Sequence, residues 1–194
     1  MIKVTSIRAC DSGDGVRLSV NIDGEKNTFD ISADDFLESG IVKGVITADD
    51  FDKLSENSRF YAAKRAAIRI IASGQCSKKK LYEKLRRKGF PHQCAKNAAD
   101  YAADCGYIDE EWQIKSYLKD LVGKRYIGRR KLLPMLLAKG YSGDKILSVL
   151  DESYTDEEFR VAKQSFLIKK FGKTKPENFE EAEEMKKALY KQGY

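Results

Sequence analysis

Two short stretches of the sequence concentrate positive charge, and both could bind a polyanion. In residues 77–88 a single acid, Glu83, stands among the basic residues, and in residues 124–131 there is no acid at all. Lys and Arg bind phosphate through charge and hydrogen bonds, so these stretches predict a polyanion-binding surface. The expected contact residues are Lys79, Lys80, Lys84, Arg86, Arg87, Lys88, Lys124, Arg125, Arg129, Arg130 and Lys131.

Catalysis and metal binding find little support in the residue types. The sequence has neither a GxxxxGK[ST] nor a GxSxG motif, and its one histidine, His92, follows a proline at an expected helix start. The four cysteines, at positions 10, 76, 94 and 105, form no CxxC pair, whereas a tetrahedral zinc site needs close ligand pairs. We therefore expect small, buried, reduced thiols, no catalytic residue, no metal and no cofactor.

The charge is distributed unevenly along the chain. Residues 59–141 carry 20 basic and 7 acidic side chains, a net charge of +13, whereas residues 1–58 carry 6 and 12, a net charge of −6. Residues 142–194 carry 10 basic and 11 acidic side chains. A basic centre between acidic or neutral flanks indicates a surface that faces a polyanion or an acidic partner. Ordinary solvated helix faces remain the alternative explanation.

The first part of the chain has the pattern of a small sheet. Apolar and polar residues alternate in residues 2–7, 16–22 and 28–31, and turn residues separate them at 11–15 and 23–26. This pattern predicts a three-stranded antiparallel meander. A capping pattern at Ser32 then opens a short helix that Gly40 ends, and Thr47 begins a similar pattern.

An internal repeat organises the rest of the chain. A leucine, a polar last helical turn, a glycine and an aromatic residue occur three times, at residues 85–90, 136–141 and 189–194. A glycine after a helix can adopt the left-handed conformation that ends it. Acidic helix starts recur near Asp109 and Thr155, each followed by an aromatic residue, Trp112 or Phe159. The repeat predicts tandem units of three helices.

The expected fold is therefore mainly α, with two complete three-helix repeats, a truncated third repeat and a small N-terminal β-rich segment. Helices are expected over residues 58–72, 77–88, 91–104, 109–125, 128–139, 142–153, 155–171 and 176–192. The predicted domain boundaries enclose residues 1–57, 58–107, 108–154 and 155–194. Pro91 and Pro176 should begin helices, whereas Pro134 should start a helix late or kink one.

These landmarks resemble the RecX family, the bacterial modulators of the RecA recombinase, over residues 59–194. Residues 77–90, SKKKLYEKLRRKGF, are similar to the family's segment of one serine, two spaced leucines and a terminal Gly-Phe. Residues 106–112, GYIDEEW, and the stretch from Gly128 to Gly140 are similar to two further family segments. The chain departs from the family pattern at Gln113, where alanine is usual, and in lacking the last helix of the third repeat.

The resemblance implies a regulatory binding protein, not an enzyme, that docks in the groove of the RecA–single-stranded DNA filament. It would inhibit recombinase and coprotease activity and so modulate DNA repair and the SOS response. The partners would be the RecA filament and single-stranded DNA, contacted directly or through RecA. Because the sequence has neither a signal peptide nor an apolar run of membrane-spanning length, we expect a cytoplasmic protein without membrane contact. We also expect it to be a monomer.

Two alternatives are kept open by the residues themselves. Three short helices could instead form a free-standing helix-turn-helix-like protein that binds DNA with weak sequence preference. Tyr126, which lies between basic residues, could stack on an exposed base or pack in the core.

Overall fold

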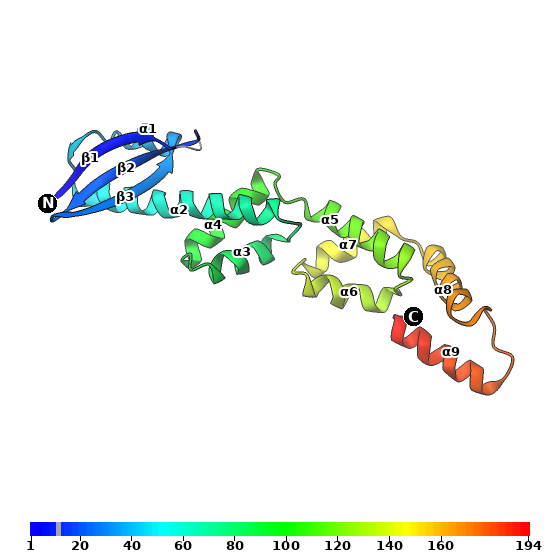
Figure 1. Cartoon of the computed structure of the whole chain (residues 1–194). Helices are drawn as coiled ribbons and strands as arrows, with labels where there is room; N and C mark the ends of the chain where they lie inside the picture. The colour runs from blue at the N-terminus through cyan, green and yellow to red at the C-terminus, as the bar shows by residue number, and fades with distance from the viewer. Residues whose placement is uncertain (11–12) are drawn as a thin grey trace. The chain divides into compact units, whose positions relative to one another are not determined.

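The computed structural model describes residues 1–10 and 13–194, a small N-terminal sheet followed by helices (Figure 1). The predicted turn at residues 11–15 falls partly outside this range, since Asp11 and Ser12 are not described. The chain divides into two compact units. Unit 1 comprises Met1–Gly74 and Leu81–Tyr107, and unit 2 comprises Gln75–Lys80 and Ile108–Tyr194. No helix in the described parts of the chain is both long and apolar enough to cross a membrane.

Unit 1 begins with the predicted antiparallel meander. Its strands are β1 (Ile2–Ala9), β2 (Gly15–Ile22) and β3 (Glu25–Ser32), and the order in the sheet is β3-β2-β1-β4. The two-residue strand β4 (Gly44–Val45) pairs with β1 and was not predicted, because two residues carry no periodicity. Alternate residues of the strands point to one side, where the buried side chains include those of Val4, Leu18, Val20 and Ile31.

Two capped helices follow the meander. Helix α1 (Ala33–Ser39) has Ser32 as its N-cap and ends at Gly40, as predicted. Helix α2 (Ala48–Ala72) begins ahead of the predicted start near residue 58, since the Thr47 hydroxyl accepts a hydrogen bond from the Asp50 amide and caps it there. No glycine or proline interrupts residues 48–72, so the helix continues from the sheet into the first repeat.

The other helices of the first repeat are α3 (Lys78–Arg87) and α4 (His92–Asp104). Helix α4 packs on α2 through a face of buried alanines, whose small side chains allow the two helices to approach closely. This face consists of Ala95, Ala98, Ala99 and Ala102. Pro91 lies at the N-cap of α4, in agreement with the predicted helix start.

Unit 2 contains the second repeat. Its helices are α5 (Glu110–Leu118), α6 (Arg129–Ala138) and α7 (Gly143–Ser153). The helix predicted over residues 109–125 is not α-helical throughout, because its last part is the π-helix η1 (Lys119–Lys124). Pro134 lies inside α6, where it lacks the N–H that would bond to the carbonyl four residues earlier. Fully buried leucine and isoleucine side chains from these helices form one core.

The third repeat consists of α8 (Asp156–Phe171) and α9 (Phe179–Gln192). Thr155 and Glu158 form the capping box that their spacing predicts. Pro176 does not begin α9, because the Asn178 side chain caps that helix two residues later. The predicted fold class is confirmed: the chain is mainly helical, with two three-helix repeats, a third of two helices and a small N-terminal sheet.

The repeated glycine ends the second helix of each repeat in the same way. The backbone angle φ is +90° at Gly89, +92° at Gly140 and +99° at Gly193, a left-handed conformation that glycine adopts at little cost. The amide of the next residue then bonds back to the last helical turn. The pairs are Phe90 to Leu85, Tyr141 to Leu136 and Tyr194 to Leu189, with nitrogen–oxygen distances of 3.3, 3.4 and 3.0 Å.

Two of these helix ends, at Gly140 and Gly193, also contact the start of the second helix of the preceding repeat. We call these contacts the first and second junctions, and both lie within unit 2. At the first, the Ser77 hydroxyl donates a 2.9 Å hydrogen bond to the carbonyl of Lys139. At the second, the Gly128 amide donates to the carbonyl of Gln192 at 3.0 Å, and the Arg130 amide donates to Gly193 at 3.2 Å. Donors at one helix start, a hydroxyl at the first junction and backbone amides at the second, therefore satisfy orphan carbonyls at another helix end.

Candidate polyanion-binding surface

Helix α3 presents the first group of predicted basic residues. Leu81 and Leu85 are fully buried and Tyr82 is half-buried, so the predicted apolar stripe faces the protein. Lys79, Arg86, Arg87 and Lys88 are exposed, whereas Lys80 and Lys84 are half-buried. The remaining arc of the helix is thus basic and accessible over its last turn.

The basic side chains at α3 differ in whether they contact other residues of the protein. Arg86 donates a 2.7 Å hydrogen bond to the carbonyl of Phe90, and Arg87 lies 3.9 Å from the Glu83 carboxylate. Lys79, Lys84 and Lys88 have no ion-pair partner among the described residues. Exposed pairs of this kind contribute little stability, so phosphate could replace Glu83 as the partner of Arg87.

Part of the second predicted group lies at the end of the π-helix. The Asp120 carboxylate is 2.9 Å from Arg125 and 3.3 Å from Lys124, so the two cations share one acid. Both cations are well exposed. Their combined charge is only half compensated, which leaves a net positive site at this end of η1.

The remaining basic residues of both groups occupy equivalent positions at the two junctions. Lys78–Lys80 form the first turn of α3, as Arg129, Arg130 and Lys131 form the first turn of α6. Cations at a helix N-terminus are disfavoured by that helix's own dipole. Here a carbonyl at the end of α9, the second helix of the third repeat, offsets part of the cost: the Lys131 ammonium donates to the carbonyl of Lys191 at 2.9 Å.

Arg129 and Arg130 are also engaged by the fold. Arg129 forms an ion pair with Asp151 and lies 3.9 Å from Asp156, and Arg130 lies 5.3 Å from the centroid of the Tyr190 ring. These contacts give the first turn of α6 a structural role that the sequence did not reveal. Their use for a polyanion stays a prediction.

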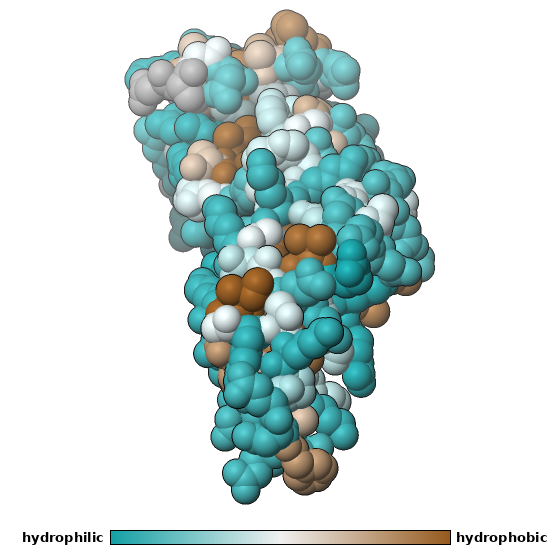
Figure 2. All heavy atoms as spheres, turned by 90° about the vertical axis from the view of Figure 1, so that its right-hand side faces the viewer, coloured by the Kyte–Doolittle hydropathy of each residue, from teal (hydrophilic) through white to brown (hydrophobic). Residues whose placement is uncertain are grey.

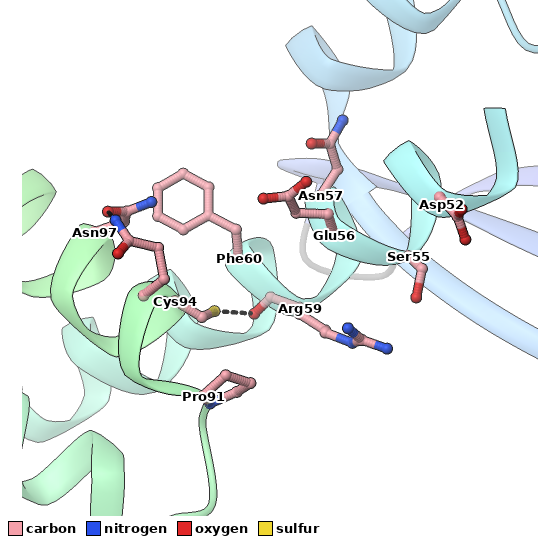
Figure 3. A pocket seen from close by; sticks show the side chains of 10 residues that line it. Asp52, Ser55, Glu56, Asn57, Arg59, Phe60, Pro91, Cys94 and Asn97 are labelled. Carbon is pink, nitrogen blue, oxygen red and sulfur yellow. Dashed lines mark hydrogen bonds between the residues drawn. The ribbon is translucent and has the colours of Figure 1, made fainter. Parts of the chain in front are cut away.

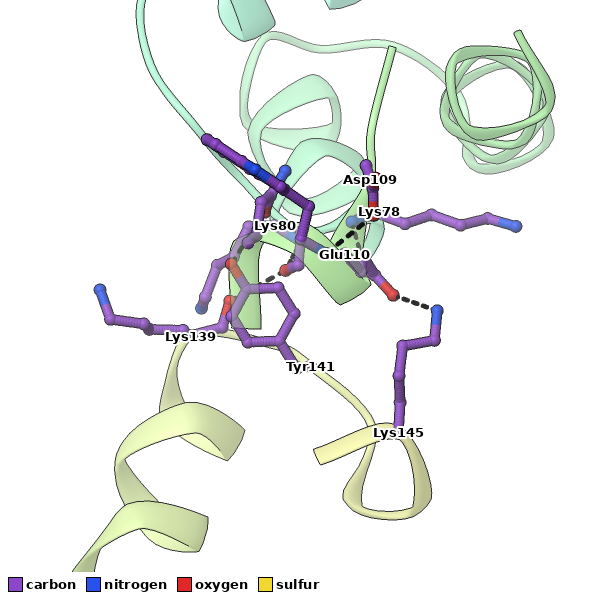
Figure 4. A network of polar contacts seen from close by, with 10 residues as sticks. Lys78, Lys80, Asp109, Glu110, Lys139, Tyr141 and Lys145 are labelled. Carbon is purple, nitrogen blue, oxygen red and sulfur yellow. Dashed lines mark hydrogen bonds and ion pairs between the residues drawn. The ribbon is translucent and has the colours of Figure 1, made fainter. Parts of the chain in front are cut away.

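A polar network surrounds the first junction (Figure 4). Glu110 accepts a 2.9 Å hydrogen bond from the Lys78 amide and a 2.7 Å ion-pair contact from Lys145, so it links the starts of three helices. Tyr141, the aromatic residue of the repeat, is buried and donates to the Gln113 side chain at 2.8 Å. Burial raises the pKa of Tyr141 well above its usual value, which keeps its hydroxyl a donor.

Several basic residues of α2 are further candidates that belong to neither basic stretch of the sequence. Arg59 and Arg69 are exposed, while the Lys64 ammonium lies 4.5 Å from the Phe60 ring centroid and 4.8 Å from that of Tyr101. They contribute to the net charge of residues 59–141, but they are spread along one helix and form no run. In the sequence, only the net positive charge of residues 59–141 indicates them as candidates.

A cavity of about 420 Å³ lies between α2 and the start of α4 in unit 1 (Figure 3). Most of its lining residues are polar, and the Cys94 thiol donates to the carbonyl of Arg59 at 3.3 Å. Burial raises the pKa of Cys94, so this cysteine is a thiol and a poor nucleophile. The lining residues are Asp52, Ser55, Glu56, Asn57, Arg59, Phe60, Pro91, Gln93, Cys94 and Asn97.

The histidine and the remaining cysteines, considered in the sequence as possible catalytic or metal-binding residues, lie in different surroundings. His92 is exposed at the start of α4, where its Nδ1 lies 2.9 Å from the Tyr82 hydroxyl. The expectation of buried thiols holds for Cys10 and Cys76 but is wrong for Cys105, which is exposed near the end of α4. The described residues include no cluster of His, Cys, Asp and Glu that could hold a metal.

Tyr126 has an unusual backbone. Its φ is +52°, a conformation that bulky residues seldom adopt, and its half-buried side chain packs against the core of unit 2. The Lys169 ammonium lies 5.4 Å from the ring centroid. The packing supports the core interpretation of Tyr126 over a freely exposed stacking surface.

Fold and exposed side chains together define a helical-repeat protein with a small N-terminal sheet and basic residues gathered on its first two repeats. No protein-family model matches the chain. The sequence is 28% identical over 201 residues to a "Regulatory protein RecX" of Clostridium perfringens strain SM101, covering 100% of this chain and 91% of that relative. It is 27% identical over 179 residues to the protein of the same name in Caldanaerobacter subterraneus, covering 92% of this chain and 87% of the relative.

Solved structures show the same fold. A crystal structure of a regulatory protein RecX matches with a TM-score of 0.78 at 15% identity, covering 100% of this chain and 95% of the other. RecX from Lactobacillus salivarius matches with a TM-score of 0.61 at 16% identity, covering 70% and 88%. The resemblance to the RecX family is confirmed: the chain is similar to RecX regulatory proteins over its whole length.

Proposed function

We propose that this protein regulates a recombinase by binding the RecA–single-stranded DNA filament, and that it inhibits recombinase and coprotease activity without catalysing a reaction. The observation that carries the proposal is the end of α3, where Arg86 and Arg87 of the last turn and the following Lys88 are exposed. Glu83 is the one nearby acid of the helix. The names of the relatives support a regulatory role.

The location of the accessible charge supports some predicted contacts more than others. Lys84, Arg86, Arg87 and Lys88 lie beyond the junction, and Lys124 and Arg125 share only Asp120. We infer that these six make the main phosphate contacts. Lys79, Lys80, Arg129, Arg130 and Lys131 would contribute from the edge of a junction that they also stabilise.

The helix-turn-helix alternative is less well supported by the geometry. A recognition helix reads base edges with residues near its N-terminus. In this protein the first turn of α3 packs against the end of α6, and a side chain placed on Gly140 would meet Ser77 at 2.6 Å and Lys80 at 3.2 Å. That turn is therefore occupied by the protein itself.

The proposal is tested by measuring the ATPase activity of RecA on single-stranded DNA with increasing amounts of this protein at two salt concentrations. The wild-type protein should inhibit, and more weakly at higher salt because counterion release contributes to phosphate binding. Reversing two charges in Arg86→Glu/Arg87→Glu should weaken inhibition by about tenfold or more, a loss of roughly 1.4 kcal/mol.

The matched control is Lys186→Glu/Lys187→Glu, which changes the net charge equally on the exposed face of α9. It should inhibit like the wild type. Circular dichroism would establish that both variants are folded. Full inhibition by a folded Arg86→Glu/Arg87→Glu protein would exclude the last turn of α3 from the interface, and sequence-dependent binding to duplex DNA would favour the alternative.

A further inference from the structure

A second cavity, of about 290 Å³, lies in unit 2 between the π-helix η1 and helix α8. Its floor includes the buried Val122 and Ala162, and Tyr126 and Tyr154 form half-buried walls. Val161 is 50% exposed at its edge. The remaining lining residues are Gly123, Glu157, Glu158 and Ser165.

Two backbone irregularities meet at this cavity. Gly123 belongs to the π-helix, and Tyr126 holds its positive φ a few residues later. Single turns of π-helix and non-glycine residues with positive φ are uncommon and occur often at functional sites. The cavity wall is therefore built from the two most unusual backbone segments of the repeat.

Exposed apolar side chains continue along α8. Ile168 is 55% exposed and lies seven residues after Val161, so both occupy the same side of the helix. Figure 2 turns the side that carries α8 and α9 in Figure 1 toward the viewer, and hydrophobic residues gather there in separate patches among hydrophilic ones.

The charges at the cavity distinguish between two possible occupants, a nucleotide of DNA and an apolar side chain of a protein. The lining contains two carboxylates, of Glu157 and Glu158, and no cation. Glu157 is paired with Arg160, whereas Glu158 accepts hydrogen bonds from Thr155 and has no ion-pair partner among the described residues. A nucleotide would bring its phosphate against this negative edge, so a DNA base is disfavoured.

The tyrosine rings point to the same conclusion. Tyr126 already has the Lys169 ammonium 5.4 Å from its ring centroid, and Tyr154 packs on Phe159 with centroids 5.9 Å apart. Neither ring is left as an open platform for base stacking. An aliphatic or aromatic side chain needs only the apolar walls, and a neighbouring basic residue would complement Glu158.

We propose that this cavity binds an apolar side chain of the protein component of the filament, next to a Lys or Arg that faces Glu158. This proposal rests on the proposed function, because the filament is taken as the partner. It assigns a second contact to the interface, one that is apolar and protein-directed, in addition to the basic contact with DNA.

The test measures binding of the full chain to RecA–single-stranded DNA filaments and to naked single-stranded DNA across a salt series. Val161→Glu places a carboxylate at the cavity edge and should weaken filament binding by about tenfold while leaving the salt slope unchanged. Glu158→Gln keeps the capping box, since Gln also serves at that position, and should weaken binding about threefold.

The control is Leu147→Glu, on an apolar residue of α7 that is 43% exposed and does not line the cavity, and it should bind like the wild type. Equal filament binding by folded Val161→Glu and wild-type proteins would overturn the cavity proposal alone. An equal loss on naked DNA would overturn it in favour of a DNA base. Absence of filament binding by the wild-type protein would overturn both the cavity proposal and the proposed function.

Discussion

Lys131 and Lys88 carry the same charge but have different surroundings. The Lys131 ammonium donates to a helix-end carbonyl at 2.9 Å, whereas Lys88 is exposed one residue beyond the end of α3. A bound phosphate would have to displace an existing contact of Lys131 but none of Lys88 among the described residues. At the scale of the residue, the exposure of a basic side chain and its existing contacts therefore decide how readily it can bind phosphate.

Asp30 provides a prediction about acid stability in unit 1. A bidentate hydrogen bond from Arg17, at 2.7 and 2.9 Å, lowers the pKa of the Asp30 carboxyl below its ordinary value of 3.8. A lowered pKa in the folded state stabilises the fold above the unfolded-state value, and this contribution disappears as the pH falls through the folded-state pKa. Arg17→Met should therefore unfold more easily near neutral pH and lose less stability on acidification.

The measurement is the urea midpoint of unfolding at about pH 6 and about pH 2.5, the second of which lies below the ordinary pKa of an aspartate carboxyl. Lys26 is exposed on β3, the strand next to the one that carries Arg17, so Lys26→Met serves as the control for loss of one positive charge. The explanation fails if Arg17→Met and Lys26→Met show the same dependence on pH.

At the scale of the element, the second helices of successive repeats contact one another: the end of α6 meets the start of α3, and the end of α9 meets the start of α6. Gly140 and Gly193 leave no room for a side chain: a Cβ would lie 2.6 Å from Ser77 Oγ in one case and 2.6 Å from Lys131 Cβ in the other. Gly89 has the same backbone conformation but nothing within 4 Å. The glycine thus ends the helix in all three repeats and permits close packing in two.

Substituting these glycines separates the two roles. Gly89→Ala and Gly140→Ala should each cost about 1–2 kcal/mol, because alanine is strained at positive φ. Gly140→Ala should cost more than Gly89→Ala, since its methyl group also meets Ser77 at the junction. Chemical denaturation followed by circular dichroism compares the two variants, and equal destabilisation would show that the junction tolerates a methyl group.

At the scale of the whole molecule, the positive charge belongs to residues 59–141, and the third repeat is nearly neutral. Unit 1 holds the acidic sheet together with most of the first repeat, and unit 2 holds the second and third repeats. The division into residues 1–57, 58–107, 108–154 and 155–194 stays a prediction. The long helix α2, which spans the first of these boundaries, indicates that the sheet and the first repeat support one another.

Salt dependence tests the electrostatic part of the interface. If Lys84 and Lys88 each neutralise one phosphate of single-stranded DNA, Lys84→Gln/Lys88→Gln should reduce the salt slope of DNA binding by about 1.4. The same substitution at Lys186 and Lys187 should leave the slope unchanged, because α9 lies outside the proposed contact residues. Fluorescence anisotropy of a labelled oligonucleotide at several salt concentrations gives both slopes, and identical slopes would remove Lys84 and Lys88 from the contact.

The sequence by itself determined the features that depend on neighbours in the chain. Caps at Ser32, Thr47 and Thr155, alternation in the strands and the glycine at each helix end are local, so their residue types predicted the elements. The repeat and the concentration of charge were also visible, because both are patterns of order and composition.

Only the tertiary structure decided which basic residues are available and where the chain departs from ideal geometry. The bond from Ser77 to Lys139, the π-helix before Tyr126 and the cavity beside Val161 depend on segments that meet in space. Local propensity contains no information about such distant partners, since their contacts form only when helices pack. For that reason the basic stretches could be found in the sequence, while the division between junction and accessible surface required the fold.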